Sequence, residues 1–162
     1  INSLHQMINS FGKKQFPKIH LIHGNMTSEE IASLFCHKSI KCLASPTRGE
    51  GYGLPLIDAA VSGIPVVATN WSGHLEFLES DLFYPVMYDL KAINKTKVDN
   101  RIFYEGVRWA EPRKESFIRQ IKSVYNDYET AKNKASTLSN KIKNDFNKKE
   151  IKIKYDKILD NL

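Results

Sequence analysis

The sequence has few of the residues that hold small extracellular or metal-stabilised proteins together. Its 162 residues include only two cysteines, Cys36 and Cys42, too few for a disulfide framework and too few for a cysteine-based zinc site. Both cysteines lie beside apolar residues, so we expect two free, buried thiols in a reducing cytosol. This composition predicts a cytoplasmic protein.

Long apolar runs are also missing. No stretch is apolar over the roughly 20 residues that a membrane-spanning helix needs, and the chain does not open on the pattern of a secretory signal peptide. It begins with Ile1 rather than methionine, so we expect a fragment or a processed product. The length is sufficient for one domain with a substantial core.

The net charge of +6 is unevenly distributed along the chain. Residues 1–112 carry equal numbers of basic and acidic side chains, whereas residues 113–162 carry 13 basic and 7 acidic ones. A nucleic-acid-binding protein would also need an aromatic platform or a recognition helix, and neither is evident, so we expect no nucleic-acid partner. We interpret the charged end as a solvated helix face, with peripheral contact to a membrane surface or an acidic partner as the alternative.

Strand and helix patterns alternate along the first half of the chain. The expected elements are a helix within 1–16 ending near Gly12, a strand at 18–23, a helix started by the capping box of Thr27 and Glu30, and strands at 41–44, 65–69 and 84–86. This alternation predicts an α/β protein with a mainly parallel sheet and helices on both faces.

The second half of the chain is more polar. Residues 88–101 are rich in lysine and asparagine and predict a surface loop, and Pro112 suits the start of a helix. Apolar residues at helical spacing then predict further helices to the end of the chain, namely Phe117, Ile121, Val124 and Tyr128, then Leu138, Ile142 and Phe146, and last Tyr155, Ile158 and Leu162.

A glycine-rich turn follows the strand predicted at 41–44. Gly49, Gly51 and Gly53 let the backbone turn sharply and approach a ligand without a Cβ in the way. Pro55 suits the first turn of the next helix, and Gly63 is placed to end it. Backbone N–H groups and the positive end of the helix dipole meet at such a turn, which favours an anion, typically a phosphate.

Two carboxylates flank this turn. Glu50 lies within it and Asp58 about one helical turn beyond Pro55, so we expect both side chains to face the same pocket. Acids that bind hydroxyl groups beside a phosphate cradle are what a sugar nucleotide requires. The stretch therefore predicts a sugar-nucleotide site.

The same residues resemble the donor-binding signature of GT-B glycosyltransferases, in the large retaining family that includes the sucrose- and glycogen-synthase-like enzymes. That signature has two carboxylates separated by seven residues around a Gly-aromatic-Gly turn, here Glu50, Gly51-Tyr52-Gly53 and Asp58. The resemblance covers about residues 18–128. In the family the first acid lies near the donor sugar and the second holds the ribose hydroxyls; this sequence has Asp rather than Glu at the second position.

The resemblance implies one half of a GT-B fold. Residues 1–112 would form a Rossmann-like nucleotide-sugar-binding domain without its first strands, and residues 113–162 a C-terminal helical extension packed on it. The missing strands, with a basic clamp for the diphosphate, would precede residue 1, and a separate N-terminal acceptor domain would complete the enzyme. The implied reaction transfers a sugar, with retention, from a nucleotide-diphosphate sugar to a sugar or glycan acceptor, and the fragment alone is expected to be inactive.

The expected site residues follow from the turn and from this resemblance. Glu50 is the expected catalytic residue, and the substrate-binding residues are Arg48, Gly49, Gly51, Tyr52, Gly53, Leu54 and Asp58, with Gly24 and Asn25 in the loop that should open on the same edge of the sheet. No Asp-x-Asp pair is present, so we expect no metal and no cofactor besides the donor itself. Ser72 suits a helix N-cap, and His74 is expected to lie at the surface or to serve packing rather than catalysis.

Two other functions fit the same pattern. A nucleotide-sugar epimerase of this fold would need acid and base groups aimed at the sugar ring. A non-catalytic nucleotide-binding module would bind the nucleotide without turnover.

Overall fold

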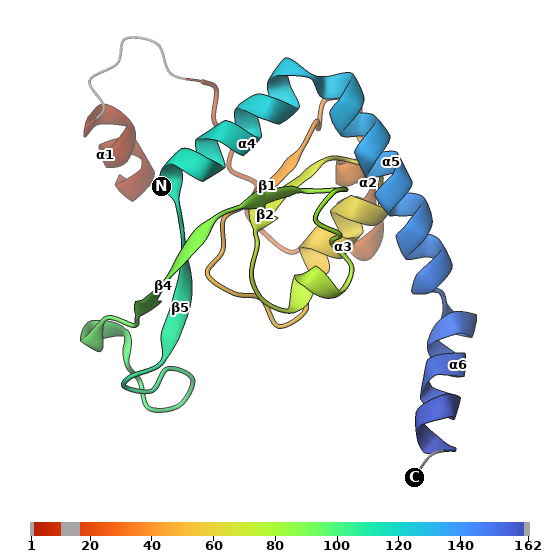
Figure 1. Ribbon diagram of the computed structural model, residues 1–162. Coiled ribbons are helices and arrows are strands. Elements are labelled where there is room, and N and C mark those ends of the chain that lie inside the picture. The colour runs from red at the N-terminus through yellow and green to blue at the C-terminus, as the bar shows by residue number, and fades with distance from the viewer. Residues whose placement is uncertain (1, 11–16, 161–162) are drawn as a thin grey trace.

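A small parallel sheet forms the centre of the protein (Figure 1). The computed structural model describes residues 2–10 and 17–160. Within them the sheet has three strands in the order β1 (Leu43–Ser45), β2 (Val66–Thr69) and β3 (Tyr84–Val86), paired in parallel throughout. The predicted α/β class and parallel sheet are confirmed, and the three strands lie within two residues of their expected positions.

Helices cover both faces of this sheet. The central strand β2 is buried on both sides, as the short apolar run Val66-Val67-Ala68 predicts. Val66 and Ala68 pack in one cluster with α3 (Leu54–Val61) and α5 (Tyr128–Asp145). Val67 packs in the other cluster, with Val124 of α4 (Lys114–Asn126). Alternate side chains of one strand therefore fix the helices of opposite faces.

The helix before β1 begins as its sequence predicts. In α2 (Ser28–Cys36), the N–H of Glu30 donates to Thr27 Oγ1 at 3.2 Å, and the Glu30 carboxylate accepts from the N–H of Thr27 at 2.8 Å. This reciprocal pair satisfies two donors that the first turn leaves without partners. The capping box is confirmed.

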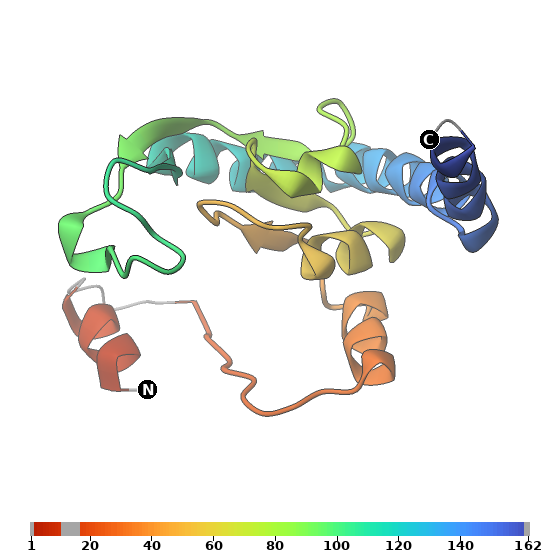
Figure 2. The ribbon, with the colours of Figure 1, turned by 90° about the horizontal axis from the view of Figure 1, so that it is seen from below.

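The strand predicted at 18–23 is wrong. Residues 17–27 form no strand and run beside the domain before α2 (Figure 2). Ile19, Leu21 and Ile22 are 47%, 61% and 62% exposed. Apolar alternation yields a strand only where a neighbouring strand accepts its backbone hydrogen bonds, and among the described residues β1 pairs only with β2. The predicted helix before it is present as α1 (Asn2–Ser10), and its expected end near Gly12 lies outside the described residues.

A two-stranded antiparallel ribbon follows the sheet, where a loop was expected. Strands β4 (Tyr88–Ala92) and β5 (Arg108–Pro112) pair with Tyr88 opposite Pro112. The loop prediction for 88–101 is therefore wrong over its first five residues; a short 3₁₀ turn, η2 (Lys95–Lys97), follows. Pro112 ends β5 instead of starting a helix, and α4 begins at Lys114. The paired residues are 16 to 24 positions apart in the sequence, so the local polarity of this segment did not reveal the pairing.

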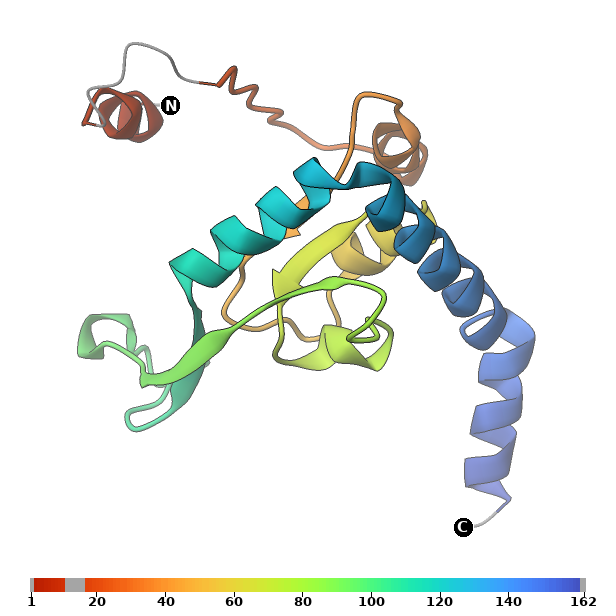
Figure 3. The same ribbon diagram turned by 45° about the horizontal axis from the view of Figure 1, so that its top comes forward.

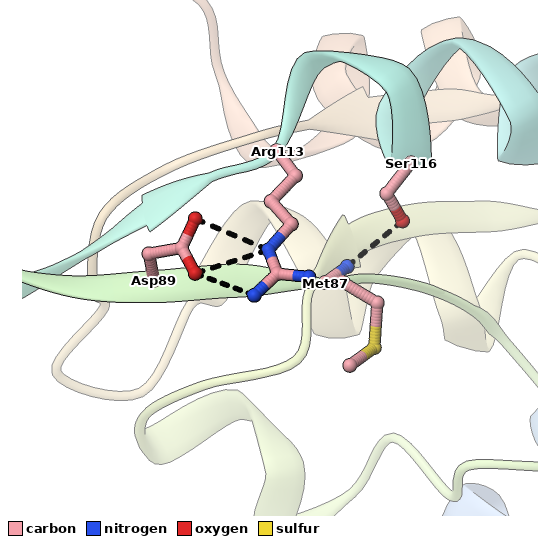
Figure 4. Close-up of polar contacts among 4 residues, drawn as sticks. All are labelled: Met87, Asp89, Arg113 and Ser116. Carbon is pink, nitrogen blue, oxygen red and sulfur yellow. Dashed lines mark hydrogen bonds and ion pairs between the residues drawn. The ribbon is translucent and has the colours of Figure 1, made fainter.

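The base of the ribbon is tied to α4 (Figure 4). The Arg113 guanidinium binds the Asp89 carboxylate, with Nε 3.1 Å from both oxygens, and this hydrogen bonding lowers the pKa of Asp89. Met87 N–H donates to Ser116 Oγ at 3.0 Å, and Met87 C=O accepts from the N–H of Arg113 at 2.7 Å. These contacts fix the direction in which the ribbon leaves the sheet.

The predicted C-terminal helices are present, and α4, α5 and α6 (Lys148–Leu159) follow one another in an arc around the sheet (Figure 3). Leu138 and Ile142 of α5 are buried in the core. On α6, Tyr155 and Ile158 are 64% and 60% exposed, and Leu162 lies outside the described residues. The domain division at residue 112 stays a prediction. Among the described residues, no helix combines the length and apolar character needed to cross a membrane.

The two cysteines differ in environment, and both are free thiols. Cys36, at the end of α2, is exposed, so its predicted burial is wrong. Cys42 is half-buried and donates its S–H to the carbonyl of Leu43 at 3.3 Å. Burial raises the pKa of the Cys42 thiol to about 11.

Candidate functional site

The glycine-rich turn lies between β1 and α3, at the carboxyl end of β1, and lines an open cavity. Its volume is about 650 Å³. One wall is formed by residues 46–51 and Ser72, and the other by Trp109 of β5 and Phe103 of the loop between β4 and β5. The ribbon that the sequence did not predict therefore completes the cavity.

The carbonyl groups of the turn are bound to neighbouring segments. Thr47 C=O accepts from Thr69 Oγ1 at 2.6 Å, and Arg48 C=O accepts from the N–H of Ala110 at 3.3 Å. Glu50 C=O accepts from Ser72 Oγ at 2.6 Å and from Gly73 N–H at 3.2 Å. Two segments distant in sequence, residues 69–73 and β5, thus bind these carbonyl groups.

The donor side of the turn faces the opposite way. In a trans peptide the C=O and the following N–H point in opposite directions, so binding of the Glu50 carbonyl by Ser72 and Gly73 directs the N–H of Gly51 away from them. The carbonyl of Gly51 also lies close against Gly73, since a Cβ built on Gly73 would come within 1.9 Å of that oxygen. The N–H groups of residues 51–54 donate no hydrogen bond to any described residue.

The start of α3 adds a favourable field at the same place. Its N-cap residue, Gly53, has the left-handed conformation with φ 83°, and no side chain caps the helix. No acidic residue lies in the first turn. The positive end of the helix dipole is therefore left uncompensated by the protein next to the free N–H groups. An anion bound here would satisfy both.

Gly51 and Gly53 serve different purposes. A Cβ on Gly51 would meet no atom within 4 Å, so this glycine leaves room that the protein itself does not fill. A Cβ on Gly53 would meet Leu56 at 3.0 Å and His74 at 3.2 Å, in a backbone conformation that side chains disfavour. Gly53 is thus required by the fold, whereas Gly51 is compatible with a ligand.

Ser72 acts differently from the expected helix cap. It occupies the N-cap position of the short 3₁₀ helix η1 (Gly73–Glu76), yet its side chain makes no cap hydrogen bond. Instead its Oγ accepts from the N–H of Glu50 at 3.2 Å and donates to the Glu50 carbonyl, with φ of Ser72 at 92°. Sequence reasoning missed this link; the adjacent small residues Ser72 and Gly73 after a buried strand were the available signal.

His74 lies under the turn and is completely buried. Its Nε2 is 2.7 Å from the carbonyl oxygen of Thr69, which can only accept, so Nε2 carries the proton. Its Nδ1 has no partner among the described residues. This position agrees with the expected packing role.

Arg48 is engaged with the ribbon. Its guanidinium binds the Glu111 carboxylate through two hydrogen bonds, of 2.6 Å from Nε and 2.9 Å from Nη2, and its central carbon lies 4.5 Å from the centre of the Trp109 ring. This hydrogen bonding lowers the pKa of Glu111 and raises that of Arg48. The pair joins the turn to β5. Contact between Arg48 and a diphosphate stays a prediction.

The two carboxylates of the signature face different hollows. Glu50 is half-buried and lines the large cavity. Asp58 is exposed and lines a groove of about 350 Å³ between α2 and α3, with Ser28 and Ile31 on the opposite side. We expected from the sequence that both carboxylates would face one pocket, but Glu50 and Asp58 line two separate hollows. Because Leu54 and Asp58 are one turn apart, one face of α3 connects the groove to the helix start.

The remaining predicted residues line neither of these hollows. Gly24 and Asn25 are exposed in the segment before α2 and do not line either hollow. The Tyr52 ring packs on Phe77 with their centres 5.2 Å apart, and Leu54 is 66% exposed at the start of α3. Their roles toward a substrate stay predictions. In the described part of the chain, no group of three or more His, Cys, Asp or Glu side chains is arranged to hold a metal ion.

Comparison with known proteins identifies the family. A family model described as family 4 glycosyltransferase in conflict systems matches residues 27–151, from the α2 cap to α6, and so includes the turn, both hollows and the ribbon. No curated protein and no solved structure matches the chain significantly. The family match takes in more than half of the sequence and agrees with the glycosyltransferase signature read from Glu50 to Asp58. This chain belongs to the family 4 glycosyltransferases of conflict systems.

Proposed function

We propose that this glycosyltransferase chain is the donor-binding part of a GT-B enzyme that uses a nucleotide-diphosphate sugar and transfers the sugar with retention. Its sheet would be a Rossmann-like half of the GT-B fold, and an N-terminal acceptor domain would supply the other half and the sugar or glycan acceptor. The chain is the donor side because the anion-binding geometry lies at the carboxyl end of a parallel strand.

The orientation of the turn carries this proposal. Carbonyl groups of the turn are bound to Thr69, Ser72, Gly73 and β5, while the N–H groups of residues 51–54, at the start of α3, donate to no described residue. The first N–H groups of a helix have no partner within the helix, so their acceptor is either solvent or a ligand. The diphosphate would accept from these N–H groups, as in other phosphate sites at helix starts.

The two hollows suggest where the rest of the donor lies. Asp58 in the α2–α3 groove would accept hydrogen bonds from the ribose hydroxyls, about one helical turn (roughly 5 Å) from the start of α3. Glu50 in the larger cavity would contact the donor sugar, where charge develops as the glycosidic bond breaks. In this arrangement the helix dipole and N–H groups stabilise the leaving diphosphate, and no metal is required.

The test uses Gly51→Val and Asp58→Asn in the whole chain, with binding measured by calorimetry. The probes are inorganic pyrophosphate and the diphosphates of uridine, guanosine and adenosine. Valine at position 51 meets no protein atom near its Cβ but fills the space before the N–H groups, so we expect at least a tenfold loss for every probe that binds. Asp58→Asn should weaken the binding of the nucleotides about tenfold, the effect of one charge-assisted hydrogen bond, and leave the affinity for pyrophosphate unchanged.

Thermal unfolding provides the control, because both positions are free of tight contacts and neither change should shift Tm by more than about 2 °C. Unchanged nucleotide affinity in Gly51→Val, or no binding by the parent chain, would rule out the turn as the diphosphate site.

A further inference from the structure

The aromatic wall of the large cavity has no role in the donor site described above. Phe103 and Trp109 both come from the ribbon and its connecting loop, and they face the glycine-rich turn across the cavity. Figure 2 shows the loop of residues 93–107, in green, beside the turn. Phe103 is 36% exposed and Trp109 half-buried, so the two rings keep free surface in a hollow that is already partly apolar.

The Trp109 ring is fixed in place. Its face carries the Arg48 guanidinium, which Glu111 holds from the same strand, and the N–H of Ala110 binds the Arg48 carbonyl. The Phe103 ring meets the Trp109 ring edge-on, at 83° with centres 6.0 Å apart. The Arg48 guanidinium and the Phe103 ring thus both hold the Trp109 ring in place.

The Phe103 backbone is fixed by an acidic side chain. Asp99 Oδ1 accepts from the N–H groups of Arg101, Ile102 and Phe103, each at 2.9 Å, and these hydrogen bonds lower the pKa of Asp99. The Phe103 carbonyl in turn accepts from the N–H groups of Asp99 and Asn100, both at 3.1 Å. Because these hydrogen bonds hold the loop backbone, less backbone entropy is lost when a ligand binds beside Phe103.

We propose that Phe103 and Trp109 form a subsite for a pyranose ring next to the glycine-rich turn. One face of a pyranose carries C–H groups that pack on aromatic rings, and its hydroxyls need hydrogen-bonding partners at the rim. The same cavity offers both, since Arg48, Glu50 and Ser72 line it beside the two rings. A concave, largely apolar site with a few fixed polar groups is the usual form of a small-ligand site.

This inference deepens the proposed function and rests on it for the position of the diphosphate. The ring could belong to the donor, whose sugar would extend from the turn into the cavity, or to the terminal residue of the acceptor glycan. Both present the same chemistry to the aromatic wall, and binding measurements separate them.

The test compares Phe103→Ala with the matched control Tyr104→Ala and the conservative variant Phe103→Tyr. Tyr104 is the next residue in the same loop, is 52% exposed and does not line the cavity. The probes are UDP-glucose, UDP-N-acetylglucosamine, GDP-mannose and ADP-glucose, their parent nucleoside diphosphates, and the free trisaccharides of glucose, N-acetylglucosamine and mannose. Calorimetry on the whole chain gives the affinities.

Phe103→Ala should lower the affinity for at least one sugar-containing probe by about two- to tenfold, the effect of one aromatic contact, and leave the parent diphosphates unchanged. Phe103→Tyr should restore the affinity, and Tyr104→Ala should not alter it. A loss confined to sugar nucleotides assigns the ring to the donor, and a loss confined to trisaccharides assigns it to the acceptor.

Two results would overturn the subsite: sugar-containing probes that bind equally well to the parent chain and to Phe103→Ala, or no sugar-containing probe that binds the parent chain. The proposed function fails differently, through absent nucleoside diphosphate binding. In that case trisaccharide binding that depends on Phe103 would still support the subsite.

Discussion

The parallel sheet and the antiparallel ribbon are held by different forces. In β2 every residue is buried, and its alternating side chains fix helices on both faces. In β4 and β5 only Ala110 is buried, and the ribbon is joined to the rest of the protein by discrete polar contacts, Arg113 with Asp89 and Arg48 with Glu111. The sheet therefore supplies the stability of the fold, whereas the ribbon supplies one wall of the site.

This difference has a consequence for the glycine-rich turn, which lies between the two regions. Its Thr47 end is bound by the last residue of β2, its Glu50 end by the segment that follows β2, and its Arg48 residue by β5. Changes in the ribbon should therefore affect ligand binding with little loss of stability. Changes in the sheet and its helices should affect both.

The largest expected effect comes from the core. Leu138, 1% exposed, packs on the α3 side of the sheet, so Leu138→Ala should lower the free energy of unfolding by about 2–5 kcal/mol. Ile102 is 75% exposed in the ribbon loop, so Ile102→Ala should change the free energy of unfolding by less than about 0.5 kcal/mol. Urea denaturation of both variants measures the contrast, and equal losses would contradict the division of roles.

An intermediate effect is expected where the turn meets the segment after β2. A Cβ on Gly73 would lie 1.9 Å from the Gly51 carbonyl oxygen, so Gly73→Ala must displace the turn. We expect a loss of about 1–3 kcal/mol in stability, the usual cost of overpacking, and weaker nucleotide binding. Gly51→Ala is the control, with open space around its Cβ and a stability change of less than about 0.5 kcal/mol. Equal losses of Tm in the two variants would contradict the close contact between Gly73 and the Gly51 carbonyl.

The smallest effect is expected at the contact between ribbon and turn. Because Arg48 lowers the pKa of Glu111, the pair stabilises the fold above the unfolded value of about 4.3, and this contribution disappears as the pH falls through the lowered pKa. Glu111→Gln should lower stability by less than about 1 kcal/mol near pH 7, because both side chains are partly exposed.

Glu105→Gln is the matched control for this change, since the Lys95–Glu105 pair lies on the same ribbon loop with side chains 88% and 73% exposed. It should leave Tm unchanged. The Tm difference between the parent chain and Glu111→Gln should narrow as the pH falls below about 4. A difference that is independent of pH would show that packing of Glu111, rather than its charge, stabilises the contact.

Local features determined much of the fold from the sequence alone. The capping box of Thr27 and Glu30, the apolar run of β2 and the glycine-rich turn before Pro55 each depend on residues within a few positions of one another. Such elements depend on short-range hydrogen bonds and on local backbone freedom, so the local sequence was sufficient to predict them. The glycosyltransferase signature from Glu50 to Asp58 is local in the same sense, and the family match agrees with it.

Tertiary structure alone decided what depends on distant partners. Residues 18–23 have a strand pattern but form no strand, because no described segment pairs with them. The polar residues of β4 do form a strand, because β5 pairs with them. The separate hollows at Glu50 and Asp58 and the link from Ser72 to the turn also arise from packing between segments. The sequence of a segment determines which apolar and hydrogen-bonding groups it carries. Only the tertiary structure determines which other segments contact those groups.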